Sequence, residues 1–66
     1  MNESEILLRL PQVCARTGLA RSTIYDLMAA NAFPKGVKLG AKSVAWVQAE
    51  VSDWVVSRIA ASRKAA

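Results

Sequence analysis

The stretch GLARSTIYDLM, residues 18–28, places its most polar residues directly after a predicted bend. Arg21, Ser22 and Thr23 would occupy the first turn of a helix, where guanidinium and hydroxyl groups can reach phosphates or the edges of bases. The backbone N–H groups of a helix N-terminus also attract phosphate. These residue types therefore indicate an interface for nucleic acid. A solvated first turn without a partner is the alternative interpretation.

The sequence offers little for catalysis or metal binding. It contains no His and a single Cys, so a zinc site lacks ligands, and Cys14 has neither a base nor a second thiol to activate it. Glu50 and Asp53 are three residues apart, but the solvated first turn of a helix accounts for both acids. We interpret Cys14 as a small core residue and expect no enzymatic activity, cofactor, metal ion or small-molecule ligand.

Basic residues are concentrated in the middle of the chain. The formal net charge is +4, with −2 in residues 1–8, six bases against Asp26 in residues 9–46, and +1 in residues 47–66. Such clustering favours a polyanionic partner such as DNA. A small domain can also carry this charge for solubility alone.

The length and the N-terminus set limits on class and location. A chain of 66 residues has room for one domain, spanning residues 1–66, with a thin core. No apolar run approaches the roughly 20 residues that span a bilayer, and the acidic start MNESEILL does not fit a signal peptide. We therefore expect a cytoplasmic protein without a membrane partner, which suits a single free cysteine.

A short first helix is predicted over residues 11–17. Pro11 suits a first helical position, and Gly18 can take the left-handed conformation that ends a helix. Leu10 falls at the N-cap position, where its side chain caps nothing.

A second helix is predicted over residues 21–30, after a turn of three residues. At 100° per residue Leu27 and Met28 lie within about 60° of Ile24, which defines a buried stripe. Leu19 can pack onto Ile24 and fix the entry of the chain into this helix. Asn31 tolerates the left-handed conformation at the helix end.

Residues 37–46 change to a period of two and predict a hairpin. Val37 and Leu39 alternate with Lys38, four residues that include Gly40 make the turn, and a second strand runs from Val44 to Trp46.

A last helix is predicted over residues 47–62. The residues expected on its buried face are Val47, Val51, Trp54, Val55 and Ile59. Packing in the core is favoured for Trp46 and Trp54 over stacking on nucleotides. Val56 falls outside this face and Arg58 falls inside it, so part of the helix could serve a homodimer contact or reach a phosphate.

Two helices joined by a three-residue turn that contains Gly are typical of a helix-turn-helix, whose second helix lies in the DNA major groove. Lys35, Lys38, Lys42 and Ser43 lie on or beside the hairpin, as in a wing that rests on the sugar-phosphate backbone. The predicted fold class is mainly α with a small β-hairpin, a winged helix-turn-helix. A charged, soluble hairpin edge is the alternative reading of these lysines.

The segments RLPQVCARTGLARSTIYDLM, FPKGVKLGAKSVAW and EVSDWV resemble the AlpA family of phage and prophage transcriptional regulators. This family of small winged helix-turn-helix proteins is similar to excisionases and to the DNA-binding domain of MerR regulators. The resemblance covers roughly residues 8 to 60 and implies a DNA-binding switch of prophage genes. The residues expected to face DNA are Arg21, Ser22, Thr23, Tyr25, Asp26, Lys35, Lys38, Lys42 and Ser43.

Three positions depart from the family pattern. Ala20 replaces the usual Ser N-cap, which should cost about 1 kcal/mol, and Asn31 stands where relatives commonly have Gly. Asp26 stands at a position that is often basic; it would repel a phosphate but could accept a hydrogen bond from a cytosine amino group, or pair with Arg16 or Arg21.

The sequence leaves three functions open. The first is a sequence-specific regulator that binds double-stranded DNA, alone or as a homodimer or cooperative assembly. An architectural excisionase that bends DNA would use much the same surface. A protein adaptor with a basic face belongs to a different class.

Overall fold

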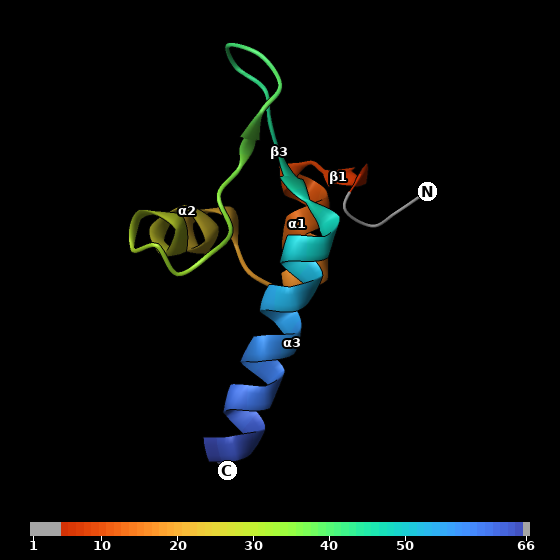
Figure 1. The fold of residues 1–66 in the computed structure, drawn as a ribbon. Helices are drawn as coiled ribbons and strands as arrows, with labels where there is room; N and C mark the ends of the chain where they lie inside the picture. Colours follow the sequence, from red (N-terminus) through yellow and green to blue (C-terminus); the bar gives the residue numbers. More distant parts are fainter. Residues whose placement is uncertain (1–4, 66) are drawn as a thin grey trace.

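The computed structural model describes residues 5–65 of the chain. Its helices are α1 (Leu10–Thr17), α2 (Arg21–Ala29) and α3 (Gln48–Ala65). Its strands are β1 (Leu7–Leu8), β2 (Val37–Lys38) and β3 (Val44–Val47), and they form one antiparallel sheet in the order β1-β3-β2. The expectation of a mainly helical chain with a small hairpin is confirmed (Figure 1).

The two ends of α1 are set by local hydrogen bonds. The helix begins at Leu10, one residue earlier than predicted, and Arg9 rather than Leu10 takes the N-cap position. The side-chain oxygen Oε1 of Gln12 accepts the Arg9 backbone N–H at 2.9 Å and so satisfies a donor at the helix start. Gly18 ends the helix with φ 72°, in the left-handed region that was predicted for it.

The two ends of α2 also follow the sequence closely. Ala20 takes the N-cap position and makes no side-chain cap bond. The helix ends at Ala29, one residue before the predicted end, and Asn31 has φ 58°, as expected for a residue that terminates a helix.

The hairpin of β2 and β3 pairs Val37 with Ala45 and Lys38 with Val44. The Leu39 N–H donates to the Ser43 carbonyl oxygen at 2.8 Å and closes the turn. Gly36 precedes β2 because any Cβ there would collide with the side chain of Val44.

Strand β1 was not predicted from the sequence. Leu7 pairs with Val47 and Leu8 with Trp46, and the Gln48 N–H donates to the Ile6 carbonyl oxygen at 2.8 Å. A strand of two residues has no alternation to detect, and its partner is about forty residues away along the chain. This pairing adds Leu8 to the core, at 3% exposure.

The core is a single cluster to which every helix contributes. Its buried members are Leu8, Val13, Ile24, Phe33, Trp46 and Val51. Around them pack the partly buried residues Leu10, Cys14, Leu19, Leu27, Met28, Val44 and Trp54. Cys14 and Trp46 therefore lie where the sequence analysis expected them, whereas Phe33 was missed.

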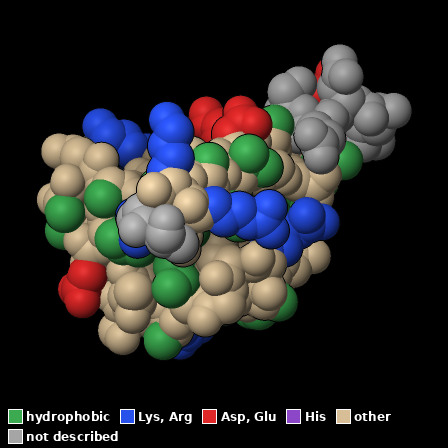
Figure 2. Space-filling model, turned by 90° about the horizontal axis from the view of Figure 1, so that it is seen from below, with side chains coloured by type: hydrophobic (Ala, Val, Ile, Leu, Met, Phe, Trp, Pro, Cys, Tyr) green, Lys and Arg blue, Asp and Glu red, His purple; other side chains and the backbone are tan. Residues whose placement is uncertain are grey.

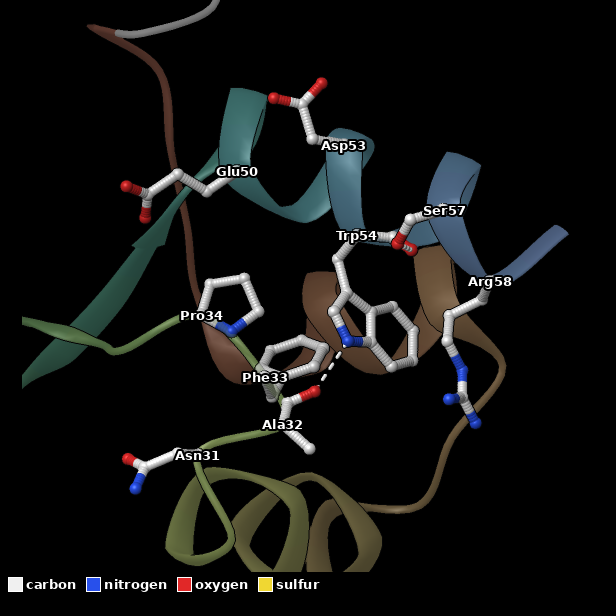
Figure 3. A pocket seen from close by; sticks show the side chains of 9 residues that line it. All are labelled: Asn31, Ala32, Phe33, Pro34, Glu50, Asp53, Trp54, Ser57 and Arg58. Carbon is white, nitrogen blue, oxygen red and sulfur yellow. Dashed lines mark hydrogen bonds between the residues drawn. The ribbon is translucent and has the colours of Figure 1, made fainter. Parts of the chain in front are cut away.

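Trp54 lies at the edge of this cluster and is half-buried. Figure 3 shows its indole ring between the side chains of Phe33 and Arg58. Its indole Nε1 donates a hydrogen bond of 2.7 Å to the Ala32 carbonyl oxygen. The ring meets Phe33 edge to face, with centroids 4.9 Å apart, and the Arg58 guanidinium lies 5.4 Å from the Trp54 ring centroid. These contacts tie α3 to the segment that follows α2.

The predicted buried face of α3 was wrong at both ends. Val47 belongs to β3, so the helix starts at Gln48, and Ile59 is 46% exposed. All residues from 56 to 64 are exposed because α3 extends beyond the rest of the molecule (Figure 1). Periodicity identified the helix but could not show where its packing partners end.

Candidate nucleic-acid interface

Three basic side chains and a tyrosine line one groove at the junction of α1, α2 and the hairpin. The groove has a volume of about 400 Å³, and its lining residues are Arg9, Leu10, Pro11, Arg21, Tyr25, Lys42 and Val44. We refer to it as the basic groove. None of the described residues that line it is acidic. The groove thus concentrates positive charge beside aromatic and apolar surface, a combination suited to a polyanion.

The turn between α1 and α2 determines how α2 is presented. The Gly18 N–H donates to the Cys14 carbonyl oxygen at 2.8 Å. The Thr17 hydroxyl donates to the Val13 carbonyl oxygen at 2.8 Å and accepts the Leu19 N–H at 3.3 Å. These bonds give residues 18–20 a defined path, so the direction of α2 is fixed relative to α1.

The buried stripe of α2 sets which of its residues face outward. Ile24 has no exposed surface, and Leu27 and Met28 pack against the core. The predicted contact residues Ser22, Thr23 and Asp26 are all exposed. Arg21 and Tyr25, one helical turn apart, lie on the side of α2 that lines the basic groove.

Arg9 is a groove residue that the sequence analysis did not single out. It was counted only as one of the six bases in the middle of the chain, although it lies two residues before Pro11, where the first helix was predicted to begin. The structure places it exposed at the N-cap of α1, where its carbonyl oxygen accepts the Val13 N–H at 3.0 Å. A basic residue just outside a helix start was the available signal.

The hairpin contributes to the groove from the other side. Lys42 is exposed in the turn and lines the groove with Val44. Lys38 is exposed and pairs with Val44, so both side chains project from the same face of the hairpin. Ser43 is half-buried.

Lys35 is not brought together with the other predicted residues. It lines a separate depression with Pro34, Gly36, Val37, Val47, Glu50 and Asp53. Val44 and Val47 are three positions apart on β3, so their side chains lie on opposite faces of the strand. The basic groove and this mixed-charge depression therefore open on different sides of the sheet.

The described residues contain neither a cluster of potential metal ligands nor a helix that could span a membrane. Within residues 5–65, the Cys, Asp and Glu side chains form no group of three that could hold a metal ion. None of the helices in this part of the chain combines the length and apolar character that crossing a bilayer requires.

Figure 2 shows Lys and Arg side chains spread over the face at which α3 ends, with acidic groups confined to a few places.

Comparison with known proteins relates the chain to prophage regulators. Residues 6–59 match the family described as prophage CP4-57 regulatory protein (AlpA). The uncharacterized protein ORF88 of Enterobacteria phage P4 is 47% identical over 60 residues, which cover 91% of this chain and 68% of that relative. The DNA-binding transcriptional activator AlpA of Escherichia coli K12 is 45% identical in an alignment 58 residues long, and the match covers 79% of this chain and 83% of the relative.

Proposed function

Because the chain belongs to the AlpA family of prophage regulatory proteins, we propose that it is a sequence-specific DNA-binding regulator of phage or prophage genes. In this proposal the domain is a winged helix-turn-helix. Helices α1 and α2 are its two helices, α2 enters the major groove, and the hairpin of β2 and β3 is the wing on the sugar-phosphate backbone. The relative named as a DNA-binding transcriptional activator supports a role in DNA binding and regulation.

The observation that carries the proposal is the convergence of Arg9, Arg21 and Lys42, from three separate elements, on the basic groove. Arg21, in the first turn of α2, is the residue we assign to base reading, because a guanidinium can donate two hydrogen bonds to guanine O6 and N7. Arg9 and Lys42 flank it and bind phosphates.

The remaining exposed residues of α2 have secondary roles in the proposal. Ser22 and Thr23 have short hydroxyl side chains that reach DNA phosphates without holding α2 away from the major groove. Tyr25 packs its ring against the sugar-phosphate backbone of the DNA. Asp26 accepts a hydrogen bond from a cytosine amino group and so contributes preference rather than affinity. Lys38 adds charge on the hairpin face that carries Val44.

The proposal is tested by fluorescence anisotropy on promoter and attachment-site DNA from the chain's own genetic neighbourhood, against a scrambled duplex. Arg21→Ala should weaken binding to the specific duplex by about 1–3 kcal/mol and reduce the preference over the scrambled one. Lys42→Ala should weaken binding to both duplexes alike.

Lys35→Ala is the matched control, because it removes the same charge from the mixed-charge depression on the other side of the sheet. It should leave affinity nearly unchanged. Equal losses for Lys35→Ala and Lys42→Ala, or equal weak affinity of the parent for every duplex, would contradict the proposed interface. DNA bending with cooperative loading would indicate an excisionase instead, and regulation that survives Arg21→Glu would indicate a protein adaptor.

A further inference from the structure

The second half of α3 carries exposed apolar side chains that the described chain does not cover. Val56 is 64% exposed and Ile59 is 46% exposed, and every residue from 56 to 64 is exposed. This part of α3 and the tip of the hairpin lie at opposite ends of the molecule (Figure 1). Val56 and Ile59 are three residues apart and so adjoin on the helix surface, and adjoining exposed apolar side chains are typical of a surface for a protein partner.

The residues on the outer side of α3 form an ordered pattern. At 100° per residue, Asp53, Val56, Ala60 and Arg63 fall within about 80° of one another, and Ile59 lies about 60° from Val56 at the edge of this face. Asp53, Ala60 and Arg63 are exposed, like Val56 and Ile59. One face therefore reads acidic, apolar and basic in order along the helix.

This acidic, apolar and basic order matches a second copy of the same face that runs in the opposite direction. We propose that the outer face of α3 binds the same face of a second copy of the chain, with the two helices antiparallel about a two-fold axis near residue 58. Asp53 of each copy then lies opposite Arg63 of the other, and Val56 of each lies near Ile59 and Ala60 of the other. A parallel arrangement would bring Asp53 against Asp53, so the charges select the antiparallel one.

The size of this face sets the strength of the contact. Residues 53 to 64 extend over about 18 Å of helix, and two such short faces bury less than the roughly 1,200 Å² typical of stable complexes. The dimer is therefore weak in free solution. The exposed ion pairs fix orientation more than they add affinity.

The arrangement has a consequence that rests on the proposed function, although the dimer itself does not. Gln48, at the start of α3, is ten residues from the axis, so the two α3 starts lie about 30 Å apart. Two copies on one duplex would meet at high effective concentration, which strengthens a weak contact.

The test is sedimentation equilibrium of the full chain without DNA, from about 50 µM to about 1 mM. The parent should self-associate to a dimer, and Val56→Glu should weaken the association at least about tenfold. Ala61→Glu introduces the same side chain at an exposed position about 140° from Val56 around the helix, and it should leave the association unchanged. Circular dichroism checks that each variant is folded.

Charge exchange tests the antiparallel register. Asp53→Arg alone and Arg63→Asp alone should each reduce self-association, while an equimolar mixture of the two variants, or the double variant, should restore it. A monomeric parent over the whole concentration range, or single reversals without effect, would overturn the proposal. Because DNA is absent, this outcome is independent of whether the basic groove binds DNA.

Discussion

At the scale of single residues, Trp54 shows how a half-buried side chain can stabilise a thin core. Its indole N–H binds the Ala32 carbonyl oxygen, its ring meets Phe33 edge to face, and Arg58 lies over it. Together these contacts hold α3 against the segment after α2.

We expect Trp54→Phe to lower the free energy of unfolding by at least about 1 kcal/mol, because the hydrogen bond to Ala32 is lost and the smaller phenyl ring keeps only part of the packing. In a domain of this size that corresponds to a fall in Tm of about 4–8 °C by calorimetry. Ser57→Ala also removes one hydrogen bond, from the exposed Ser57 hydroxyl to the Trp54 carbonyl oxygen, and should change Tm far less. Equal effects of the two variants would show that the indole bond contributes nothing.

At the scale of elements, α2 combines a well-defined end with a weak beginning. Asn31 terminates it in the left-handed region, and Ala30 donates its N–H to the Asp26 carbonyl oxygen at 3.1 Å. At the start, Ala20 has φ −73° and ψ 157°, the extended geometry of an N-cap, but it has no side-chain acceptor for the free N–H groups. These free donors lie in the same turn as Arg21, where a phosphate could accept from them.

Ala20→Ser should therefore stabilise the domain by about 1 kcal/mol, because its hydroxyl can accept an N–H of the first turn in a backbone geometry that already suits a cap. Chemical denaturation monitored by circular dichroism measures the change. Ala30→Ser, at the other end of α2, is the control and should be near neutral. No gain from Ala20→Ser would mean that the first turn is satisfied in another way.

At the scale of the whole molecule, the placement of the basic residues distinguishes one surface from another, whereas the net charge does not. The chain carries +4, but the basic groove gathers Arg9, Arg21 and Lys42 without an acid in its lining, while Lys35 shares its depression with Glu50 and Asp53. The molecule measures 42 × 29 × 19 Å, and the basic end of α3 lies far from the hairpin tip (Figure 1). Two groups of basic residues can thus be compared at equal total charge.

The logarithm of DNA affinity should fall with the logarithm of salt concentration, with a slope of about −0.9 for each neutralised phosphate. Arg9 and Lys42, the two groove residues assigned to phosphates, should therefore contribute about −2 to this slope. Replacing both Arg9 and Lys42 with Gln should reduce the steepness by about 2. Replacing both Lys35 and Lys64 with Gln removes the same charge from exposed positions outside the groove and should leave the slope nearly unchanged. If both pairs reduce the slope equally, the protein binds through net charge and not through the groove.

The sequence by itself determined the features that depend on neighbouring residues. Gly18 and Asn31 are found at helix ends because Gly and Asn are among the few residues that tolerate the positive φ found there. The spacing of Ile24, Leu27 and Met28 shows which side of α2 is buried. These rules act within one or two helical turns, so they can be read locally. The contact residues of α2 were predicted in this way, and their role in binding DNA stays a prediction.

Only the tertiary structure decided what depends on distant segments. β1 is defined by backbone hydrogen bonds to β3, and Leu8 and Phe33 are buried because other elements cover them. Arg9 joins Arg21 and Lys42 in one groove, and Lys35 does not, because strand alternation and the α1–α2 turn determine which surface each side chain reaches. The second half of α3 is likewise exposed because no other described element packs against it, and periodicity along one helix does not show where such packing ends.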